Sequence, residues 1–293
     1  MNTSRLTALS CALSCFVAAF VAAADGGGFT LPVRLRHAAY HAPGVPSAIV
    51  HAAPGFKADR PLHLVVYLHG YDGCTPVLMG RGAVHCRPND PAREGWDLGR
   101  YHDAAQENTL FIVPQLALNA RDGRPGAFGE PGGFRAFLEE LLAGPLKGPL
   151  GRSHTLDDVA SIHLVAHSGG YQTAIAILEQ GGVRERIRSL VLFDALYGET
   201  DRFADDLEAH LADGFHFVSI ALAHGIPARE NALLLRRLRD DLGPERVVTS
   251  DAAHLSEAIA RHPIVIAEGR PPHRLVPATH LSEVLRSLHV GTR

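Results

Sequence analysis

The sequence is poor in several features that would assign it to a specialised class of proteins. It has one tryptophan, two methionines and four cysteines in 293 residues, and its formal net charge is only −3. It contains no block of like charge, no internal repeat and no low-complexity tract. Nothing in it therefore points to binding of nucleic acid or of an acidic membrane surface. With 46% hydrophobic and 20% charged residues, its composition is that of an ordinary globular protein.

Metal-binding patterns are missing as well, although the chain has 18 histidines. No pair of histidines has the His-Glu-x-x-His spacing, and no cluster of cysteines accompanies them. Histidines scattered without such spacing are more often surface or core residues than metal ligands. We therefore expect no metal site and no cofactor.

The N-terminal residues have the features of a secretory signal peptide. One arginine among the first five residues is followed by an apolar stretch over Leu6–Ala23, and positions 22–24 are all alanine. Small residues at this point suit cleavage before Asp25. An anchoring transmembrane helix is the alternative, disfavoured by the small residues and the cleavage-type ending. Residues 1–24 are thus predicted to be removed, and the mature protein to be periplasmic or secreted.

Removal of the signal peptide would leave two cysteines, Cys74 and Cys86. Export implies an oxidising compartment, where two cysteines usually pair. We therefore predict a disulfide between them, with two free thiols as the alternative. A bond that closes so short a loop contributes roughly 2–3 kcal/mol by the chain-entropy relation.

The rest of the chain alternates between short apolar runs and helical patterns. This alternation predicts an α/β fold with a mostly parallel central sheet of about eight strands and helices on both faces. The segment 73–96, rich in glycine and proline, reads as an ordered insertion loop of a single domain over 25–293. Strands are expected at 29–37, 47–52, 62–68, 109–114, 161–166, 188–193, 215–221 and 246–249, and helices at 98–107, 131–142, 171–179, 201–211, 227–242 and 281–288.

The most informative stretch is Ser161–Gly170. It reads as a short apolar strand ending at Ala166, a tight turn with Ser168 at its tip, and a helix from Tyr171. A strand-turn-helix of this kind can hold a serine hydroxyl exposed above a sheet, ready to attack a carbonyl carbon. The usual pattern is Gly-x-Ser-x-Gly, and alanine replaces the first glycine here. The alternative is a glycine-rich turn with an incidental serine.

A nucleophilic serine needs a base to take its proton and an acid to orient that base. In parallel sheets the reactive groups gather at the carboxyl ends of strands. Asp194 directly follows a predicted strand and is the preferred acid, with Asp251 as the weaker rival. The base is expected late in the chain, in a loop before the closing helix. We place it at His280, with His254 and His273 as alternatives.

The negative oxygen of a tetrahedral intermediate needs preorganised donors. One expected donor is the backbone N–H of Gly169, at the start of a helix whose dipole favours negative charge. The other is the N–H of Tyr71, which follows His69 and Gly70 just past a predicted strand. His69 is expected to organise this loop rather than act as the base, because it precedes the serine in the chain.

Four features together resemble the α/β-hydrolase superfamily: a His-Gly turn after a strand, a serine elbow, an acid after the next strand and a histidine before a final helix. They lie at 68–71, 166–170, Asp194 and His280, and the resemblance covers nearly all of the mature chain in element order. It implies that the nucleophile, acid, base and oxyanion roles fall on Ser168, Asp194, His280 and the N–H groups of Gly169 and Tyr71. The acid lies one strand earlier than in most members, although some lipases use that placement.

The resemblance favours a serine hydrolase that cleaves carboxylic esters through an acyl-enzyme. A peptide or amide hydrolase of the same fold is one alternative, and a catalytically inactive hydrolase-like binding protein is another. The expected partner is a small-molecule or polymeric ester, with no nucleic acid and, after signal cleavage, no membrane. The segment 73–96 is expected to overhang the serine, with Trp96, Tyr71 and Met79 as possible apolar walls of the pocket.

Overall fold

The computed structural model describes residues 27–211 and 214–291. The predicted signal peptide, residues 1–24, lies outside these ranges. Of the helices within them, none combines the length and the apolar character that crossing a membrane requires.

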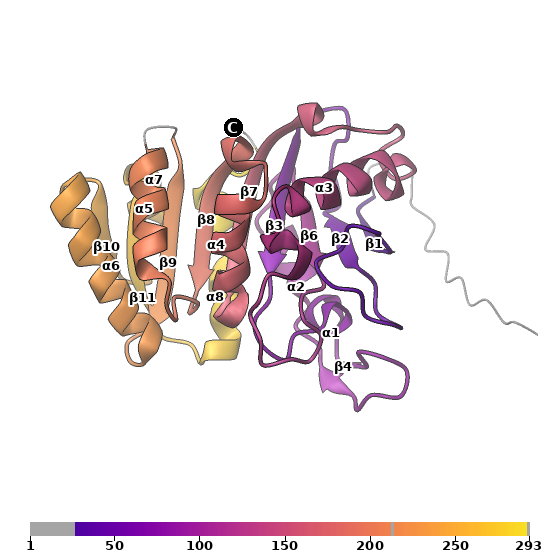
Figure 1. Ribbon diagram of the computed structural model, residues 1–293, viewed down its shortest axis with the longest axis horizontal. Helices are drawn as coiled ribbons and strands as arrows, with labels where there is room; N and C mark the ends of the chain where they lie inside the picture. Colours follow the sequence, from indigo (N-terminus) through magenta and orange to yellow (C-terminus); the bar gives the residue numbers. More distant parts are fainter. Residues whose placement is uncertain (1–26, 212–213, 292–293) are drawn as a thin grey trace, which may run out of the picture.

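A nine-stranded sheet forms the centre of the molecule (Figure 1), with the strand order β1-β2-β6-β3-β7-β8-β9-β11-β10. All neighbouring pairs from β6 to β10 are parallel, whereas β2 is antiparallel to both β1 and β6. The predicted fold class is therefore confirmed, with nine strands where about eight were expected. The strands are β1 (Phe29–Val33), β2 (Ala48–Ala52), β3 (Leu62–Leu68), β6 (Leu110–Pro114), β7 (Val159–His167), β8 (Ile187–Phe193), β9 (His216–Leu222), β10 (Val247–Ser250) and β11 (Ile264–Gly269).

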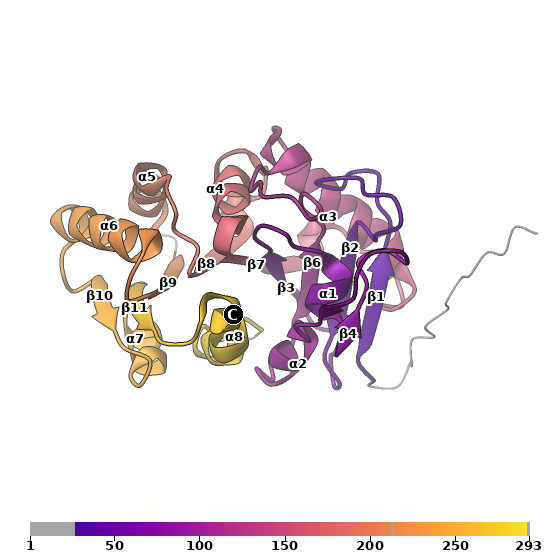
Figure 2. The same ribbon diagram turned by 90° about the horizontal axis from the view of Figure 1, so that it is seen from below.

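Helices cover both faces of this sheet (Figure 2). They are α1 (Thr75–Met79), α2 (Leu98–Asp103), α3 (Gly133–Ala143), α4 (Tyr171–Gln180), α5 (Thr200–His210), α6 (Ile226–Leu242), α7 (Leu255–Arg261) and α8 (Val276–Ser287). One face packs against α3, α4, α5 and α6, and the other against α2, α7 and α8. Side chains of strand β3 pack into the hydrophobic cores on both faces of the sheet. Leu64 and Leu68 belong to the first core, and Val65 and Tyr67 to the second, because successive side chains of a strand point to opposite faces.

The C-terminal part differs from the prediction. The strand expected at 246–249 was to be the last one, but β11 follows it and inserts between β9 and β10. The apolar, β-branched run Ile264–Ile266 is a strand signal that sequence reasoning passed over. Helix α8 begins at Val276 rather than at 281, so His280 lies inside the helix and not in the loop before it. The loop that leaves the carboxyl end of β11 is therefore 270–275.

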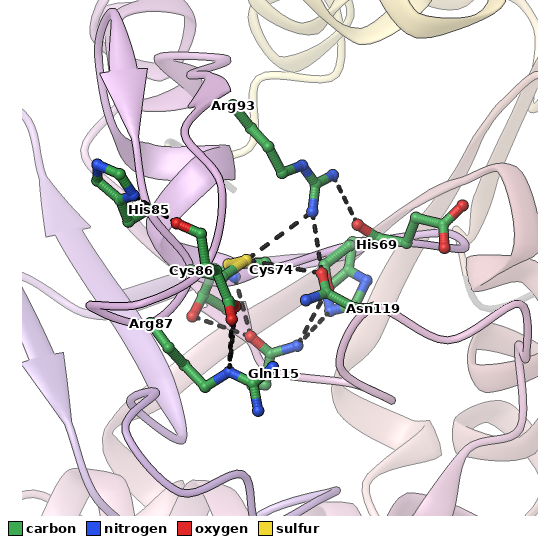
Figure 3. The surroundings of a disulfide bond; sticks show 12 residues. His69, Cys74, His85, Cys86, Arg87, Arg93, Gln115 and Asn119 are labelled. Atoms are coloured by element: carbon green, nitrogen blue, oxygen red, sulfur yellow. Dashed lines mark hydrogen bonds and ion pairs between the residues drawn. A yellow bond between two sulfur atoms is a disulfide. The ribbon is translucent and has the colours of Figure 1, made fainter.

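The segment 73–96 has more structure than a loop. It contains α1 and a small hairpin of β4 (Ala83–Val84) and β5 (Arg93–Glu94). The predicted disulfide between Cys74 and Cys86 is confirmed, with a Cα–Cα distance of 6.0 Å across a sequence separation of 12 (Figure 3). Both cysteines are buried, and Val77 belongs to the same small core. The cross-link thus ties this segment into one unit beside the carboxyl end of β3.

Strand order explains why the candidate residues meet. β7 lies between β3 and β8 in the sheet, and the three strands are parallel. The residues that follow them, His69-Gly70, Ser168 and Asp194, therefore emerge side by side at one edge of the sheet.

Candidate active site

Ser168 lies at the turn between β7 and α4, in the short 3₁₀ helix η4 (Ser168–Gly170). Its φ is +54°, in the left-handed region that residues other than glycine rarely adopt. Backbone strain of this kind gathers at functional sites, where the surrounding structure holds it in place. The side chain is half-buried, at the start of α4. The local conformation is thus the sharp strand-to-helix turn that the sequence predicted.

Close packing around this turn explains its small residues. A methyl group on Gly170 would lie 2.3 Å from the carbonyl oxygen of Leu68, and one on Gly70 would lie 2.5 Å from the Cβ of Ser168. Ala166, which replaces the usual first glycine, is fully buried in the core on the α4 side of the sheet. The methyl of Ala166 therefore fits where the usual pattern has glycine.

Asp194 follows β8 and is almost fully buried, with a φ of +45°. One carboxylate oxygen accepts a hydrogen bond from the N–H of Leu222 at 3.1 Å. The other lies 2.5 Å from Nδ1 of His273, in the loop after β11. A buried carboxylate paired with a histidine in this way fixes the orientation of the imidazole and leaves its Nε2 to exchange a proton.

His167 supports the position of His273. Its Nε2–H donates to the backbone carbonyl of His273 at 3.0 Å, and the two rings pack with centroids 4.5 Å apart. Burial, and then the proximity of His273, lower the pKa of His167 to about 3. Its ring therefore stays neutral at ordinary pH and can act as a fixed donor. Trp96 packs edge-on against the other side of this ring, with centroids 5.4 Å apart.

The structure pairs Asp194 with His273 and not with His280. The side chain of His280 is 4% exposed, within α8, and its nearest ionisable partner is Glu283, at 3.8 Å from Nδ1. Neither ring nitrogen of His280 has a hydrogen-bond partner among the residues described. Burial lowers the pKa of this imidazole. Its place in the chain suggested a base, but α8 begins too early for it to reach the carboxylate.

Asp251 and His254, the alternative acid and base named from the sequence, lie next to each other and away from Ser168. Nδ1 of His254 is 2.8 Å from an Asp251 oxygen, and both side chains are exposed. They line a hollow of about 720 Å³ over β10 and α7 that includes none of the residues at 69–71, 168 or 194. This pair is a local contact between residues three apart in sequence. Ser250 lines the same hollow, but its hydroxyl donates to the backbone carbonyl of Asp251 at 3.0 Å and forms no hydrogen bond to His254.

Ser168 and His273 line the same cavity, of about 200 Å³. Its walls also include Tyr71 and Trp96, as expected, and Leu78. Met79, the third expected wall, does not line this cavity and lies instead at a separate hollow beside β1. Among the described residues the Ser168 hydroxyl forms no hydrogen bond, neither to His273 nor to any other side chain. The arrangement brings a candidate nucleophile and an imidazole to one pocket, and the imidazole is bonded to a buried carboxylate.

The turn after β3 is clamped by His69. Its Nδ1–H donates to the Gly70 carbonyl at 2.9 Å, while its Nε2 accepts the N–H of Leu116 at 3.0 Å. Burial lowers the pKa of His69 to about 4, so the ring is neutral, as this pattern requires. In a trans peptide the N–H points away from the C=O. With the Gly70 carbonyl held toward His69, the N–H of Tyr71 must point away from His69.

Three potential metal ligands lie outside this site. His51, His102 and Asp103 bring one ligand atom each within 4.8 Å of one another. His51 Nε2 already bonds an Asp103 oxygen at 2.9 Å, and His102 Nε2 bonds Thr109. This group lies at the β2–α2 contact and is separate from the chemistry around Ser168.

Comparison with solved structures identifies the fold. A mutant of the feruloyl esterase module from Clostridium thermocellum, complexed with sinapinate, matches over 92% of this chain and 90% of its own, with a TM-score of 0.57 and 9% identity. The chain has the α/β-hydrolase fold. A CE1 ferulic acid esterase from Anaeromyces mucronatus also matches, over 89% of this chain and 91% of its own, but with a TM-score of 0.42 and 11% identity, too low to support an argument. Neither the scan against protein-family models nor the search of curated proteins finds a match.

In this α/β-hydrolase fold, Ser168 after β7 and Asp194 after β8 were predicted from the sequence. The sequence did not predict that the loop 270–275 contacts Asp194. His273 was an alternative, and its preference over His280 requires knowing that β11 exists. His167 was not considered at all, although it sits inside the elbow motif. Pro277 was an available signal, because proline is favoured in the first turn of a helix, where α8 has it, and a helix that begins there contains His280.

Proposed function

We propose that the protein is a serine hydrolase that cleaves carboxylic esters through an acyl-enzyme intermediate. Ser168 is the nucleophile, His273 the base, and Asp194 the acid that orients it. The observation that carries the proposal is the short contact between the buried Asp194 and His273, together with the cavity that His273 and Ser168 both line. The fold shared with a feruloyl esterase module supports an ester as the substrate.

In the first half of the reaction, the hydroxyl oxygen of Ser168 attacks the carbonyl carbon of the ester. Its proton moves to Nε2 of His273, while Asp194 stabilises the imidazolium through Nδ1–H. The tetrahedral intermediate collapses, the bond to the alcohol oxygen breaks, and His273 returns the proton to that oxygen. The products are a free alcohol and an acyl group on Ser168.

In the second half, a water molecule attacks the acyl carbon. His273 takes a proton from this water, and Ser168 recovers it when the acyl bond breaks, which releases the carboxylic acid. In both halves the negative oxygen is stabilised by the backbone N–H groups of Gly169 and Tyr71. Removing one such donor typically costs about 3 kcal/mol of transition-state stabilisation.

The proposed enzyme acts outside the cytoplasm. Residues 1–24 are a cleaved signal in this proposal, and residues 25–293 form one catalytic domain. The disulfide between Cys74 and Cys86 supports export, because disulfides persist in oxidising compartments. Feruloyl-type and acetyl esters belong in the first substrate screen, beside p-nitrophenyl esters of graded length and peptide anilides.

Labelling with a fluorophosphonate probe tests the assignment of the nucleophile. The parent protein and a Ser256→Ala control, whose serine bonds Glu283 on the surface, should label equally. Ser168→Ala should lose both labelling and ester hydrolysis while its melting temperature stays unchanged. Labelling that persists in Ser168→Ala would place the nucleophile elsewhere.

A matched pair of histidine variants tests the base. His273→Gln should lower kcat by at least about a thousandfold, because the triad acts as a unit. His280→Gln should keep kcat within a few-fold of the parent, whatever it does to stability. The reverse order of effects would return the role of base to His280.

A further inference from the structure

Two arginines line the cavity that holds Ser168, and no carboxylate pairs with either of them. Arg93 comes from β5 of the cross-linked segment, and Arg274 directly follows His273. Within the described ranges, neither guanidinium lies within 4.0 Å of a carboxylate oxygen, although most other arginines there do. A cavity with two uncompensated cations beside a reactive serine calls for an anionic occupant.

Arg93 is half-buried and held by neutral acceptors (Figure 3). Nη1 donates to Oδ1 of Asn119 at 2.9 Å, and Nη2 donates to the backbone carbonyl of Asp72 at 2.7 Å. These bonds fix the guanidinium plane without neutralising its charge. The positive charge of Arg93 also acts on His69: burial is the main cause that lowers the pKa of His69, and the charge of Arg93 lowers it further.

Arg274 is held in the same manner. Its Nη2 donates to the backbone carbonyl of Glu94 at 2.7 Å, and its guanidinium lies over the ring of Trp96, 5.4 Å from the centroid. A carbonyl and an aromatic face orient an arginine and leave its charge free for another partner. Because Arg274 follows His273 in the chain, its position is tied to that of the proposed base.

The carboxylates nearby are occupied or exposed. Asp194 is committed to His273, and the Asp72 carboxylate lies 3.9 Å from Nε of Arg121. Glu94 is exposed and forms no ion pair among the residues described. The residues that line the cavity thus include two arginines and one carboxylate residue, Asp72, so positive charge exceeds negative charge there.

We propose that Arg93 and Arg274 form an anion subsite, so that the preferred substrate is an ester that carries a second, negatively charged group, in its simplest form a carboxylate. The inference rests on the proposed ester hydrolysis and narrows its substrate class. The apolar walls, Trp96, Val77 and Leu78, accommodate the part of the substrate between the scissile ester and the anion. A planar guanidinium fork binds a carboxylate through two parallel hydrogen bonds, which a neutral ester cannot form.

Matched substrates test the subsite. The first pair is mono-p-nitrophenyl glutarate, which has a carboxylate on the acyl side, and its methyl ester. The second pair is 4-acetoxybenzoate, with a carboxylate on the leaving group, and its methyl ester. We expect kcat/KM to favour the anionic member of at least one pair by about tenfold or more, the order expected of one charge-assisted interaction. The preference should shrink as ionic strength rises.

Substitutions of the two arginines test whether they cause the preference for anionic esters. Arg274→Met, at an exposed side chain, should reduce the ratio of kcat/KM for anionic over neutral ester by about fivefold or more, and Arg93→Met should do the same. Arg93→Lys keeps the charge and guards against loss of folding, and should retain part of the ratio. Arg81→Met is the control, because Arg81 lies in the same segment, is 80% exposed and pairs with Asp97 outside the cavity. It should leave the ratio unchanged.

The outcomes separate the two proposals. Hydrolysis of neutral esters with no preference for either anionic partner would overturn the anion subsite and leave the esterase proposal standing. A preference that survives in both Met variants would also overturn it. Absence of hydrolysis together with absence of fluorophosphonate labelling would overturn both.

Discussion

Replacing Gly70 by alanine should damage the site by displacing it, although every proposed catalytic residue keeps its identity. The added methyl would lie 2.5 Å from Cβ of Ser168 and 2.9 Å from both the backbone nitrogen of Gly169 and the carbonyl oxygen of His167. Carbon atoms in packed proteins approach to about 3.5–4.0 Å, so the elbow or the turn after β3 must move by about 1 Å. Backbone atoms surround the methyl, so no side chain can turn aside to make room.

The expected loss follows from that displacement. A shift of about 1 Å in a reacting group costs on the order of a hundredfold in rate, and overpacking costs about 1–3 kcal/mol of stability. We therefore expect Gly70→Ala to lower kcat for a p-nitrophenyl ester by about a hundredfold. In a chain of this size the melting temperature should fall by roughly 2–4 °C for each kcal/mol lost.

Gly99→Ala is the matched control for this prediction. A methyl there would meet its nearest neighbours, in His51 and Met79, at 3.5 Å, which is ordinary contact distance. Gly99 lies in helix α2, where alanine is favoured over glycine by up to about 1 kcal/mol. The control should keep kcat and equal or exceed the parent in stability. A Gly70→Ala protein with kcat within twofold of the parent would show that the close approach of the two turns does not position the reacting groups.

Two further predictions concern stability. Burial lowers the pKa of His69 to about 4 and of His102 and His167 to about 3, whereas an unfolded histidine titrates near 6.5. Between these values the unfolded chain binds more protons, so the free energy of unfolding should fall as pH drops from about 6.5 to 4, by about 1.4 kcal/mol per pH unit for each such histidine. A melting temperature that is flat from pH 7 to pH 4.5 would contradict this. Replacing both Cys74 and Cys86 by serine should lower the free energy of unfolding by about 3 kcal/mol, because a cross-link over 12 residues is lost. It should also raise KM more than it lowers kcat, since the segment walls the cavity, and unchanged melting with unchanged kinetics would refute both statements.

Much of this protein can be predicted from local sequence. The run Leu62–Leu68 is apolar throughout because β3 is covered on both faces, and its strand was predicted with the observed bounds. The elbow around Ser168 is equally local, since the strand, the turn and the helix follow one another within a few residues. The cysteines could be paired from their number and the predicted export alone. In each case the physical cause lies within a short stretch of chain.

The partner of Asp194 depends instead on contacts between distant parts of the chain. His273 and His280 both lie late in the chain, seven residues apart, and their local sequences do not distinguish them. What distinguishes them is the insertion of β11 between β9 and β10, which delivers the loop 270–275 to the carboxyl end of β8. Strand order is set by side-chain packing across the whole sheet, and no short window of sequence contains that information.

The same division applies to Arg93 and Arg274. Their sequence positions are 181 residues apart (274 − 93), and only the folded chain brings their charges to one cavity. Residue types and their periodicity predicted most of the strands and helices and the nucleophile turn, because those depend on near neighbours. The tertiary structure decided which imidazole meets the carboxylate and which charges surround the serine, because those depend on how distant elements pack.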